Sequence, residues 1–213
     1  MRIEIGFDDC LVGDLKALAL LDWYDLKGTF YYPSVYKGRA DSLSMKQVHE
    51  QIAMKGYEVG GHTTTHPMDM KLLEDKDLKF QVEENKKTIE GFLTKKPITK
   101  FCYPRGRHDE RVREAVKKAG YLEARTTKVL QIRNDTGDPF QTPTTIHMFQ
   151  REEYQGVHWL ELAKIYLQKA LEASRTDDSI FFSIWGHSCE LDEAGDWDAF
   201  EKILGKLSTI PVW

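Results

Sequence analysis

The chain has 213 residues, of which 41% are hydrophobic and 30% are charged, so it is long enough to bury one substantial core. Its formal net charge of -4 and its pI near 6.0 argue against nucleic acid as the main partner, because phosphate binding requires a basic surface. No apolar run approaches the roughly 18 residues that a membrane-spanning helix needs, so we expect no membrane span.

The N-terminus and the cysteines indicate a compartment. The first residues, MRIEIGFDDC, enter a strand-like stretch directly and lack the basic and apolar regions of a signal peptide. The cysteines are Cys10, Cys102 and Cys189, and no CxxC pair suggests a disulfide framework. We therefore expect a cytoplasmic protein, or else a chain whose secretion leader has been removed.

Short apolar runs alternate with amphipathic stretches along the whole chain, and no repeat or linker divides it, so we expect one domain over residues 1–213. The pattern predicts strands over residues 2–7, 29–32, 57–61, 98–103, 121–126, 179–185 and 210–213. It predicts helices over residues 14–25, 44–55, 71–93, 108–119, 158–174 and 197–207. Residues 127–155 are rich in turn signals and leave room for two short strands.

This alternation of strands and helices is typical of βαβ units and a parallel sheet. About seven such units with right-handed crossovers favour an α/β fold of the distorted (β/α)7 barrel type, with a doubly wound sheet as the alternative. In both architectures ligands bind at the carboxyl ends of the strands. Residues capable of chemistry should therefore follow the predicted strands.

Such residues do follow four of the predicted strands. Asp8 and Asp9 close the first strand, and His62 follows the strand over 57–61. A turn with the sequence YPRG follows the strand over 98–103, and His187 follows the strand over 179–185. The fold class therefore predicts one site built from several strand ends.

His62 and His66 are four residues apart, which places two imidazoles on one face if the segment is helical. This spacing alone is a weak signal, but here it directly follows the end of a strand. Together with Asp9, the pair makes a three-ligand set with an open position, as in catalytic zinc sites. A comparable set also binds iron(II) in oxygenases.

The turn after the fourth predicted strand contains Pro104 and Gly106, which favour an unusual backbone that can aim an N–H group at a developing oxyanion. A plain β-to-α turn is the alternative. His187 has the placement of a general acid, and a solvated surface histidine is its alternative.

Four motifs in this order resemble those of the polysaccharide deacetylases, also called NodB-homology or carbohydrate esterase family 4 enzymes: GFDDC, HTTTHP, FCYPRG and SIWGH. They extend from residue 6 to residue 187, and the PRGRHD and WGHSCE variants resemble a shorter branch of the family. The resemblance implies a distorted barrel of about seven strands. It also implies a hydrolase of carbon–nitrogen bonds other than peptide bonds, which removes N-acetyl (or O-acetyl) groups from a sugar or glycan.

The resemblance also implies roles for individual residues. A divalent metal, zinc first and cobalt, nickel or manganese as alternatives, would be bound by Asp9, His62 and His66. Asp8 would be the general base and His187 the general acid, while the backbone N–H of Arg105 would help to hold the oxyanion.

The chain departs from the family pattern at two cysteines. Cys10 stands where the family has glycine, and Cys102 stands where the family has the arginine that contacts the base aspartate. The partner of Asp8 is therefore open. The carboxylate that tunes the acid histidine is also open, and the candidates are Asp135, Asp196 beside Trp197, and Glu190.

Aromatic and cationic residues near the motifs are candidates for substrate contact. Tyr103, Pro104 and Trp185 are expected to bind substrate, with the two aromatic rings and Trp197 as a stacking surface for a sugar. Filling of the core is the alternative for these rings. Arg105 and Arg107 are candidates to meet an anionic group, or else are part of a solvated loop. The cysteines near the motifs could supply a metal-binding or redox-sensitive thiolate, or act as small buried hydrophobic residues.

Two other functions remain open. One is a metal-dependent amidohydrolase for an amide that is not a sugar, and the other is a sugar-binding pseudoenzyme. A protein that only binds sugar does not need all five ionisable residues of the motifs, which argues against the pseudoenzyme. These residues are Asp8, Asp9, His62, His66 and His187. We expect an N-acetylated sugar or glycan as the partner, with no nucleic acid, and the oligomeric state remains open.

Overall fold

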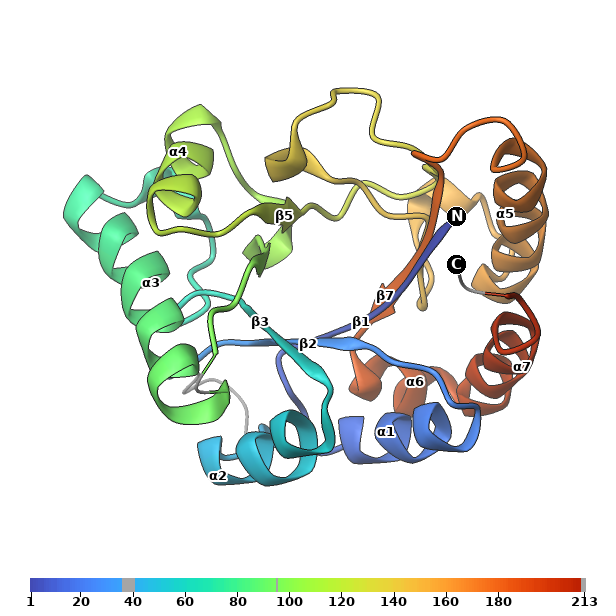
Figure 1. Ribbon diagram of the computed structural model, residues 1–213, viewed down its shortest axis with the longest axis horizontal. Coiled ribbons are helices and arrows are strands. Elements are labelled where there is room, and N and C mark those ends of the chain that lie inside the picture. The colour runs from blue at the N-terminus through green and yellow to red at the C-terminus, as the bar shows by residue number, and fades with distance from the viewer. Residues whose placement is uncertain (36–40, 95, 212–213) are drawn as a thin grey trace.

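A computed structural model describes residues 1–35, 41–94 and 96–211 of the chain, and its centre is a sheet of seven parallel strands (Figure 1). Parallel pairing joins all neighbours in the order β5-β4-β3-β2-β1-β7-β6. The strands are β1 (Arg2–Asp8), β2 (Thr29–Tyr32), β3 (Glu58–Gly61), β4 (Lys100–Cys102), β5 (Glu123–Arg125), β6 (Ile146–His147) and β7 (Phe181–Gly186).

The strand order identifies the fold as a distorted (β/α)7 barrel rather than a doubly wound sheet. Each strand from β1 to β5 pairs with the next one in the chain, and β7 returns to pair with β1. A doubly wound sheet would reverse direction at its first strand and place the later strands progressively outward. The circular order and the curled sheet in Figure 1 confirm the predicted fold class.

The circle of strands is incomplete between β5 and β6. A short parallel bridge joins Arg125 to Thr142, and the Thr126 N–H donates to the Thr142 carbonyl at 2.9 Å. The Thr145 N–H in turn donates to the Ser183 carbonyl on β7 at 3.0 Å. The segment 142–145 therefore links the two edges of the barrel without being a full strand.

Helices cover the outside of the curled sheet, as Figure 1 shows. The α-helices are α1 (Asp14–Trp23), α2 (Met45–Gln47), α3 (Asp75–Thr88), α4 (Glu110–Lys118), α5 (Trp159–Ala173), α6 (Ser188–Ala194) and α7 (Trp197–Leu207). Helix α2 continues as a wider turn over Val48–Ile52 and a tighter turn over Ala53–Lys55, so the predicted helix over 44–55 is helical almost throughout. The prediction over 71–93 starts too early, because only a short turn (Met70–Leu72) precedes α3.

Local capping explains several helix boundaries. Ser44 and Gln47 form a reciprocal capping box at the start of α2, and Gly56 ends the helical stretch with φ at +81°. The Asp109 carboxylate accepts a hydrogen bond from the Val112 N–H at 2.9 Å and so begins α4. Short-range side-chain chemistry, visible in the sequence, thus determines where these elements begin and end.

Three predictions need correction. Helix α6 was not expected, because its seven residues are too few for a clear helical period. Residues 127–155 contain one two-residue strand, β6, instead of two. The expected last strand is wrong at Ile210 and Pro211, which lie in a bend and in irregular structure, and residues 212–213 lie outside the described ranges.

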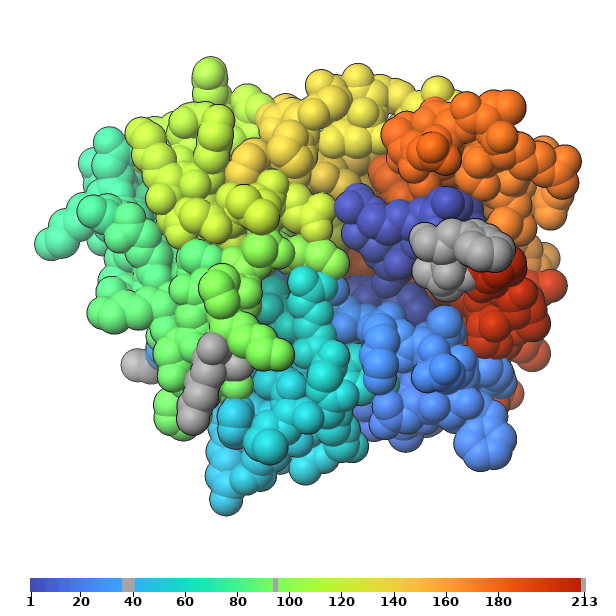
Figure 2. All heavy atoms as spheres, viewed as in Figure 1, coloured from blue at the N-terminus to red at the C-terminus, as the bar shows by residue number. Residues whose placement is uncertain are grey.

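The core lies between the sheet and its helices. Phe7 of β1 stacks on Phe30 of β2 with ring centres 5.6 Å apart, and meets the edge of Phe200 of α7 at 5.5 Å. The start of β1, dark blue in Figure 2, lies near the centre of that face and against the orange C-terminal part of the chain. The carboxyl ends of the strands lie at the opposite end of the barrel. Within the described residues, no helix combines the length and the apolar character required to cross a bilayer.

The two glycines that end β3 allow close approach of neighbouring side chains. A Cβ atom on Gly60 would lie 2.6 Å from the Tyr31 ring, and one on Gly61 would lie 2.2 Å from the Tyr121 hydroxyl oxygen. Both contacts are far shorter than real Cβ contacts, so the sheet requires glycine here.

Gly61→Ala should therefore lower the free energy of unfolding by about 1–3 kcal/mol, because the methyl group overpacks a buried site. Gly91→Ala is the matched control, since a Cβ at Gly91 meets no atom within 4 Å, and it should be neutral or slightly stabilising. Chemical denaturation measures both changes. Equal stability of the two variants would show that Gly61 is not required for packing.

Candidate active site

The two neighbouring aspartates reach one cavity because the chain turns sharply after β1. Asp9 and Cys10 have left-handed backbones, with φ at +74° and +49°. This conformation is costly for residues other than glycine and is often found at functional sites. Because the regular strand ends at Asp8, its pleat no longer sends Asp8 and Asp9 to opposite faces. The Cys10 position, where the family has glycine, retains the backbone conformation that glycine favours.

The cavity has a volume of about 440 Å³ and lies at the carboxyl ends of β1, β3, β4 and β7. Its lining residues come from all four sequence motifs and from the segments that follow them: Asp8, Asp9, His62, His66, Arg105, Thr127, Trp185, His187, Cys189, Glu190 and Glu193. The predicted clustering of strand-end residues is therefore present in the structure.

Asp9, His62 and His66 form a donor set that fits a divalent metal ion. Oδ1 of Asp9 lies 3.7 Å from Nε2 of His62 and 3.6 Å from Nε2 of His66. This oxygen is buried, and no hydrogen bond from the described residues reaches it. A buried carboxylate oxygen without a partner is unfavourable unless a cation or a proton compensates it. Two imidazoles and one carboxylate are ligands that zinc binds readily.

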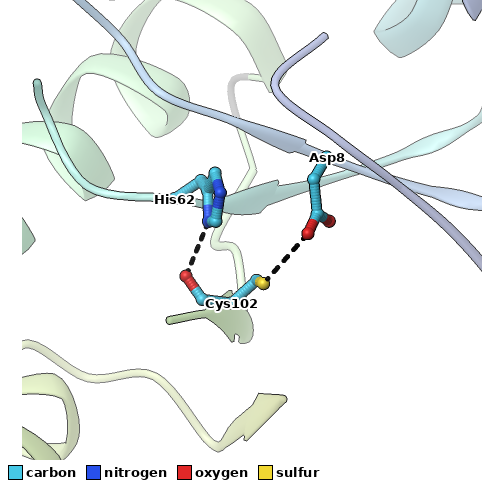
Figure 3. Close-up of side chains that lie close together, drawn as sticks. All are labelled: Asp8, His62 and Cys102. Carbon is cyan, nitrogen blue, oxygen red and sulfur yellow. Dashed lines mark hydrogen bonds between the residues drawn. The ribbon is translucent and has the colours of Figure 1, made fainter. Parts of the chain in front are cut away.

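His62 is oriented as a metal ligand would be. Its Nδ1 lies 2.7 Å from the carbonyl oxygen of Cys102, as Figure 3 shows, so Nδ1 carries the proton and Nε2 presents its lone pair. The His62 N–H also donates to Oδ1 of Asn85 at 3.0 Å. Both contacts hold the ring in place beside Asp9.

His66 reaches the site although its segment does not form the helix in which a four-residue spacing would place His62 and His66 on one face. Residues 62–66 are not helical, and Thr63 and His66 have left-handed backbones with φ at +68° and +53°. The His66 N–H donates to the Thr63 hydroxyl at 3.0 Å, and the two imidazole rings lie 4.9 Å apart. Burial and the neighbouring His62 lower the pKa of His66 to about 4, which keeps its imidazole neutral.

Asp8 has a partner that the sequence analysis missed. Its Oδ1 accepts a hydrogen bond from Nη2 of Arg125, which ends β5, and its Oδ2 accepts one from the Cys102 thiol at 3.5 Å (Figure 3). Cys102 and Arg125 are paired residues on the neighbouring strands β4 and β5. The arginine that the family pattern has at Cys102 is therefore supplied here from the next strand. Its signal in the sequence is an arginine at the end of a predicted strand.

The ion pair sets the charge of Asp8. Burial raises the pKa of this carboxyl, but the Arg125 guanidinium outweighs burial and lowers the pKa to about 2. The guanidinium is also held 4.5 Å from the ring centre of Trp185 and 5.0 Å from that of Tyr31. Burial and the nearby Asp8 raise the pKa of the Cys102 thiol. Cys102 is therefore a protonated donor to Asp8, which argues against a thiolate metal ligand at this position.

His187 is held by Glu190, one of the three carboxylates considered as its partner. Nδ1 of His187 lies 2.8 Å from Oε2 of Glu190 on helix α6. Burial lowers the pKa of His187, but the hydrogen bond and the charge of Glu190 outweigh it and raise the pKa to about 9. The other two candidates lie elsewhere, since Asp196 accepts from His158 and Trp159, and Asp135 pairs with Arg133 in a separate hollow.

Most of the residues expected to stack on a substrate are in the core. Tyr103 is fully buried, and its hydroxyl donates to the Phe140 carbonyl at 3.0 Å, so it does not reach the cavity. Pro104 is buried in the turn after β4. Trp185 lines the cavity but is only 3% exposed, so it offers an edge rather than a platform. The indole N–H of Trp197 donates to Asp192, and this ring is 9% exposed.

The two arginines of the turn after β4 point in different directions. Arg105 lines the cavity with φ at +56°, and its N–H belongs to the first helical turn, whose amides lack intrahelical partners. Arg107 points away to Asp69, with the two charged groups 3.5 Å apart.

The two remaining cysteines differ in their surroundings. Cys10 is buried in the core, and Cys189 lines the cavity beside Glu190.

The parallel barrel carries an Asp-His-His donor set, a paired aspartate and a histidine at its strand ends. The family model described as "Polysaccharide deacetylase" matches residues 2–124, which is more than half of the chain. The chain belongs to the polysaccharide deacetylase family. The matched region includes Asp8, Asp9, His62 and His66 but ends before Arg125, and His187 and Glu190 lie beyond it.

Known proteins of this family are similar to the chain over part of their length. The Bacillus subtilis (strain 168) protein YxkH, which is named as a polysaccharide deacetylase, is 26% identical over 136 residues. The match covers 63% of this chain and 48% of YxkH, so the chain spans about half the length of that relative.

Two solved structures share the fold. The Streptococcus pyogenes deacetylase PplD in complex with acetate superposes with a TM-score of 0.61 and 21% identity, over 67% of this chain and 62% of PplD. BA3943 from Bacillus anthracis, a CE4 family pseudoenzyme, superposes with a TM-score of 0.57 and 17% identity, over 97% of this chain and 61% of BA3943. At these identities, the likeness shows the fold alone.

Arg125→Met should lower the free energy of unfolding by about 3–5 kcal/mol, because it leaves the buried charge of Asp8 without compensation. The double variant Asp8→Asn/Arg125→Met should lose less than Arg125→Met, since the stranded charge is gone. Arg133→Met, which breaks an exposed pair, should cost at most about 1 kcal/mol. Urea denaturation gives all three values, and a cost for Arg125→Met no greater than for Arg133→Met would contradict the role of the buried pair.

Proposed function

We propose that this protein is a metal-dependent deacetylase that hydrolyses N-acetyl (or O-acetyl) groups on a sugar of a glycan. The observation that carries this proposal is the division between the two aspartates. Asp9 offers a bare buried oxygen between two imidazoles, while its neighbour Asp8 is kept ionised by Arg125. Hydrolysis of an amide requires both an electrophilic centre and a base, and the two functions are adjacent here.

The metal would be held by Asp9, His62 and His66, with zinc the best match to these ligands. Such a cation acts as a Lewis acid that polarises the acetyl carbonyl and makes a water molecule acidic near neutral pH. The chain prepares for it by keeping the His66 imidazole neutral and by orienting the His62 ring through the Cys102 carbonyl.

Asp8 would act as the general base. A pKa of about 2 keeps its carboxylate ionised throughout the neutral range, and it lines the same cavity as Asp9. Arg125 and the Cys102 thiol bind one oxygen each and thereby fix the plane of the carboxylate. A fixed orientation helps a general base, because the base must stay within hydrogen-bond reach of the proton that it takes.

His187 would act as the general acid. Its Nε2 lies 3.9 Å from Oδ2 of Asp9, so the ring edge faces the same cavity. With Nδ1 held by Glu190 and a pKa of about 9, the ring carries a proton on Nε2 at neutral pH and can deliver it to the leaving nitrogen. The Arg105 N–H would donate to the developing oxyanion, an interaction worth about 2.7–4 kcal/mol in other hydrolases.

A second hollow supports a glycan rather than a small amide as the substrate. It has a volume of about 360 Å³ and shares Thr127 with the first cavity, while Gly106 next to Arg105 lines it. Its lining is polar and charged, with side chains such as Gln131 and Arg133, which suits the hydroxyl groups of a sugar. The reacting sugar and a neighbouring sugar could therefore lie side by side.

A sugar-binding pseudoenzyme is the alternative from a different class, because the fold is shared with a pseudoenzyme of the family. The side chains favour the enzyme. A binder has no need for an ionised buried aspartate beside the donor set or for a histidine held in its protonated form.

The proposal is tested by measuring acetate release from a panel of N-acetyl and O-acetyl sugars and oligosaccharides. Zinc-loaded protein should release acetate from at least one of them, chelator should abolish the release, and added zinc should restore it. Asp8→Asn should lose at least about 100-fold in turnover while still binding zinc, because it removes only the base.

Release that persists after complete metal removal would contradict the mechanism. Zinc-loaded protein that binds sugars but releases no acetate from any of them would favour the pseudoenzyme. Release from simple amides without preference for sugars would favour the second enzyme class.

The pH profile should report on Glu190. Activity needs His187 in its charged form, so turnover should fall as the pH rises through about 9. Glu190→Gln removes the charge that raises this pKa, so the alkaline limb should move at least 1 unit lower, towards the ordinary histidine value of about 6.5. Glu193→Gln, on the same helix and cavity, is the control and should leave the limb in place. An unchanged limb in Glu190→Gln would show that Glu190 does not tune the acid.

A further inference from the structure

A fourth histidine lies behind the proposed acid, in addition to His62, His66 and His187. His147 ends β6, and its side chain is 8% exposed. Its ring stacks on Trp185, with ring centres 4.0 Å apart and planes inclined by 16°, and the two residues are paired across β6 and β7. No motif of the sequence analysis includes this residue.

One carboxylate oxygen connects His147 to His187. Oε2 of Glu190 lies 2.9 Å from Nε2 of His147, 2.8 Å from Nδ1 of His187 and 3.0 Å from the backbone nitrogen of His187. Three donors thus converge on one atom. Two of them come from the residue that Glu190 orients, and the third comes from a different strand.

The backbone of His147 is firmly anchored. The hydroxyl of Tyr154 accepts from the His147 N–H at 2.6 Å and donates to its carbonyl at 3.0 Å. Tyr154 is itself 2% exposed. Together with the stack on Trp185, these bonds leave the His147 ring little freedom, so its Nε2 is a stationary donor.

Glu190 needs such a donor because it is a long side chain at the start of a short helix. Its side chain is 19% exposed, and a glutamate has several rotamers that differ little in energy. A fixed donor on a neighbouring strand selects the rotamer in which Oε2 meets His187. Fixing the support of a catalytic group commonly improves its geometry and therefore its rate.

We propose that His147 is a positioning residue for His187, which acts by holding Oε2 of Glu190 so that the imidazole keeps its Nε2 edge towards the cavity. This inference rests on the proposed function, in which His187 delivers a proton. His147 touches neither the proposed metal ligands nor the open part of the cavity.

A second metal ion held by His147, His187 and Glu190 is the competing interpretation, since their donor atoms lie within 4.8 Å of one another. The hydrogen bonds disfavour it. Both ring nitrogens that face Oε2 are at hydrogen-bond distance from it, and the His187 N–H points to the same oxygen. A cation would have to displace these donors.

The experiment compares two substitutions of His147 in the zinc-loaded protein. His147→Phe keeps a flat ring against Trp185 but removes the donor, and His147→Gln keeps a donor N–H but removes the ring. If the donor matters, His147→Phe should lose at least about 10-fold in kcat with KM within 2-fold, and His147→Gln should recover most of the loss. His158→Phe, which breaks a histidine–carboxylate contact with Asp196, is the control and should keep full kcat.

A double-variant cycle makes the test specific for Glu190. In a Glu190→Gln background, His147→Phe should cause no further loss of kcat, because its effect passes through that carboxylate. Wild-type kcat in His147→Phe would overturn the inference. Equal losses in the Phe and Gln variants, or fully additive losses in the cycle, would also overturn it. If His147→Phe does not fold, His147→Met replaces it as the variant without a donor.

Two further measurements separate this inference from the proposed function. One zinc per chain in the wild type agrees with the inference, and a second equivalent that disappears in His147→Phe would overturn it in favour of a second metal. If wild-type protein releases no acetate at all, the proposed function fails, and a crystal structure of His147→Phe still decides the positioning role. Displacement of Glu190 from His187 would support the role, and an unchanged 2.8 Å contact would overturn it.

Discussion

The ion pair between Asp8 and Arg125 crosses the inside of the barrel, and the chemistry of the site depends on it. The two residues end β1 and β5, which are not neighbours in the sheet. Both side chains are almost completely buried, and a buried ion pair is favourable only with good geometry and additional hydrogen bonds. The Cys102 thiol and the rings of Trp185 and Tyr31 supply that surrounding. The pair keeps one aspartate ionised and leaves its neighbour available for a metal.

The left-handed turn at Asp9 and Cys10 makes this division possible. Two adjacent carboxylates on a regular strand would point to opposite faces, and close together they would oppose each other's ionisation. In this protein Asp8 meets a guanidinium, while Asp9 turns towards His62 and His66. Arg125 therefore compensates the Asp8 charge, and the proposed metal ion would compensate Asp9, so the two carboxylates can share one cavity.

Much of the fold could be predicted because it depends on local patterns. The alternation of apolar strands and amphipathic helices indicated the parallel barrel, and the four motifs indicated which strand ends meet. The predictions that failed concern segments whose structure depends on contacts distant in the sequence. Segment 142–145 is held by hydrogen bonds from both edges of the barrel, so its pattern resembles a loop. Tyr103 looked like a substrate platform, but the turn after β4 directs its ring into the core.

The candidate site follows the same rule. The proposed metal ligands and the two residues proposed for proton transfer stand in recognisable motifs, although the His62 and His66 rings meet through left-handed turns rather than through a helix. Arg125 and His147 stand in no motif, because each matters through a contact that is distant in the sequence: Arg125 meets Asp8 of β1, and His147 meets Glu190 of α6. Glu190 was one of three candidates for the carboxylate beside His187. It is the one in contact because helix α6 places it one turn after His187.

A metal site at the buried oxygen of Asp9 is the part of the proposed function on which the other roles depend. Calorimetric titration of the metal-free protein with zinc measures whether this site exists. We expect one zinc ion bound per chain and an affinity at least about 100-fold weaker in Asp9→Asn, which keeps the shape of the side chain but removes the charge. Zinc binding of equal strength in Asp9→Asn, or no zinc binding by the unaltered protein, would rule out this metal site.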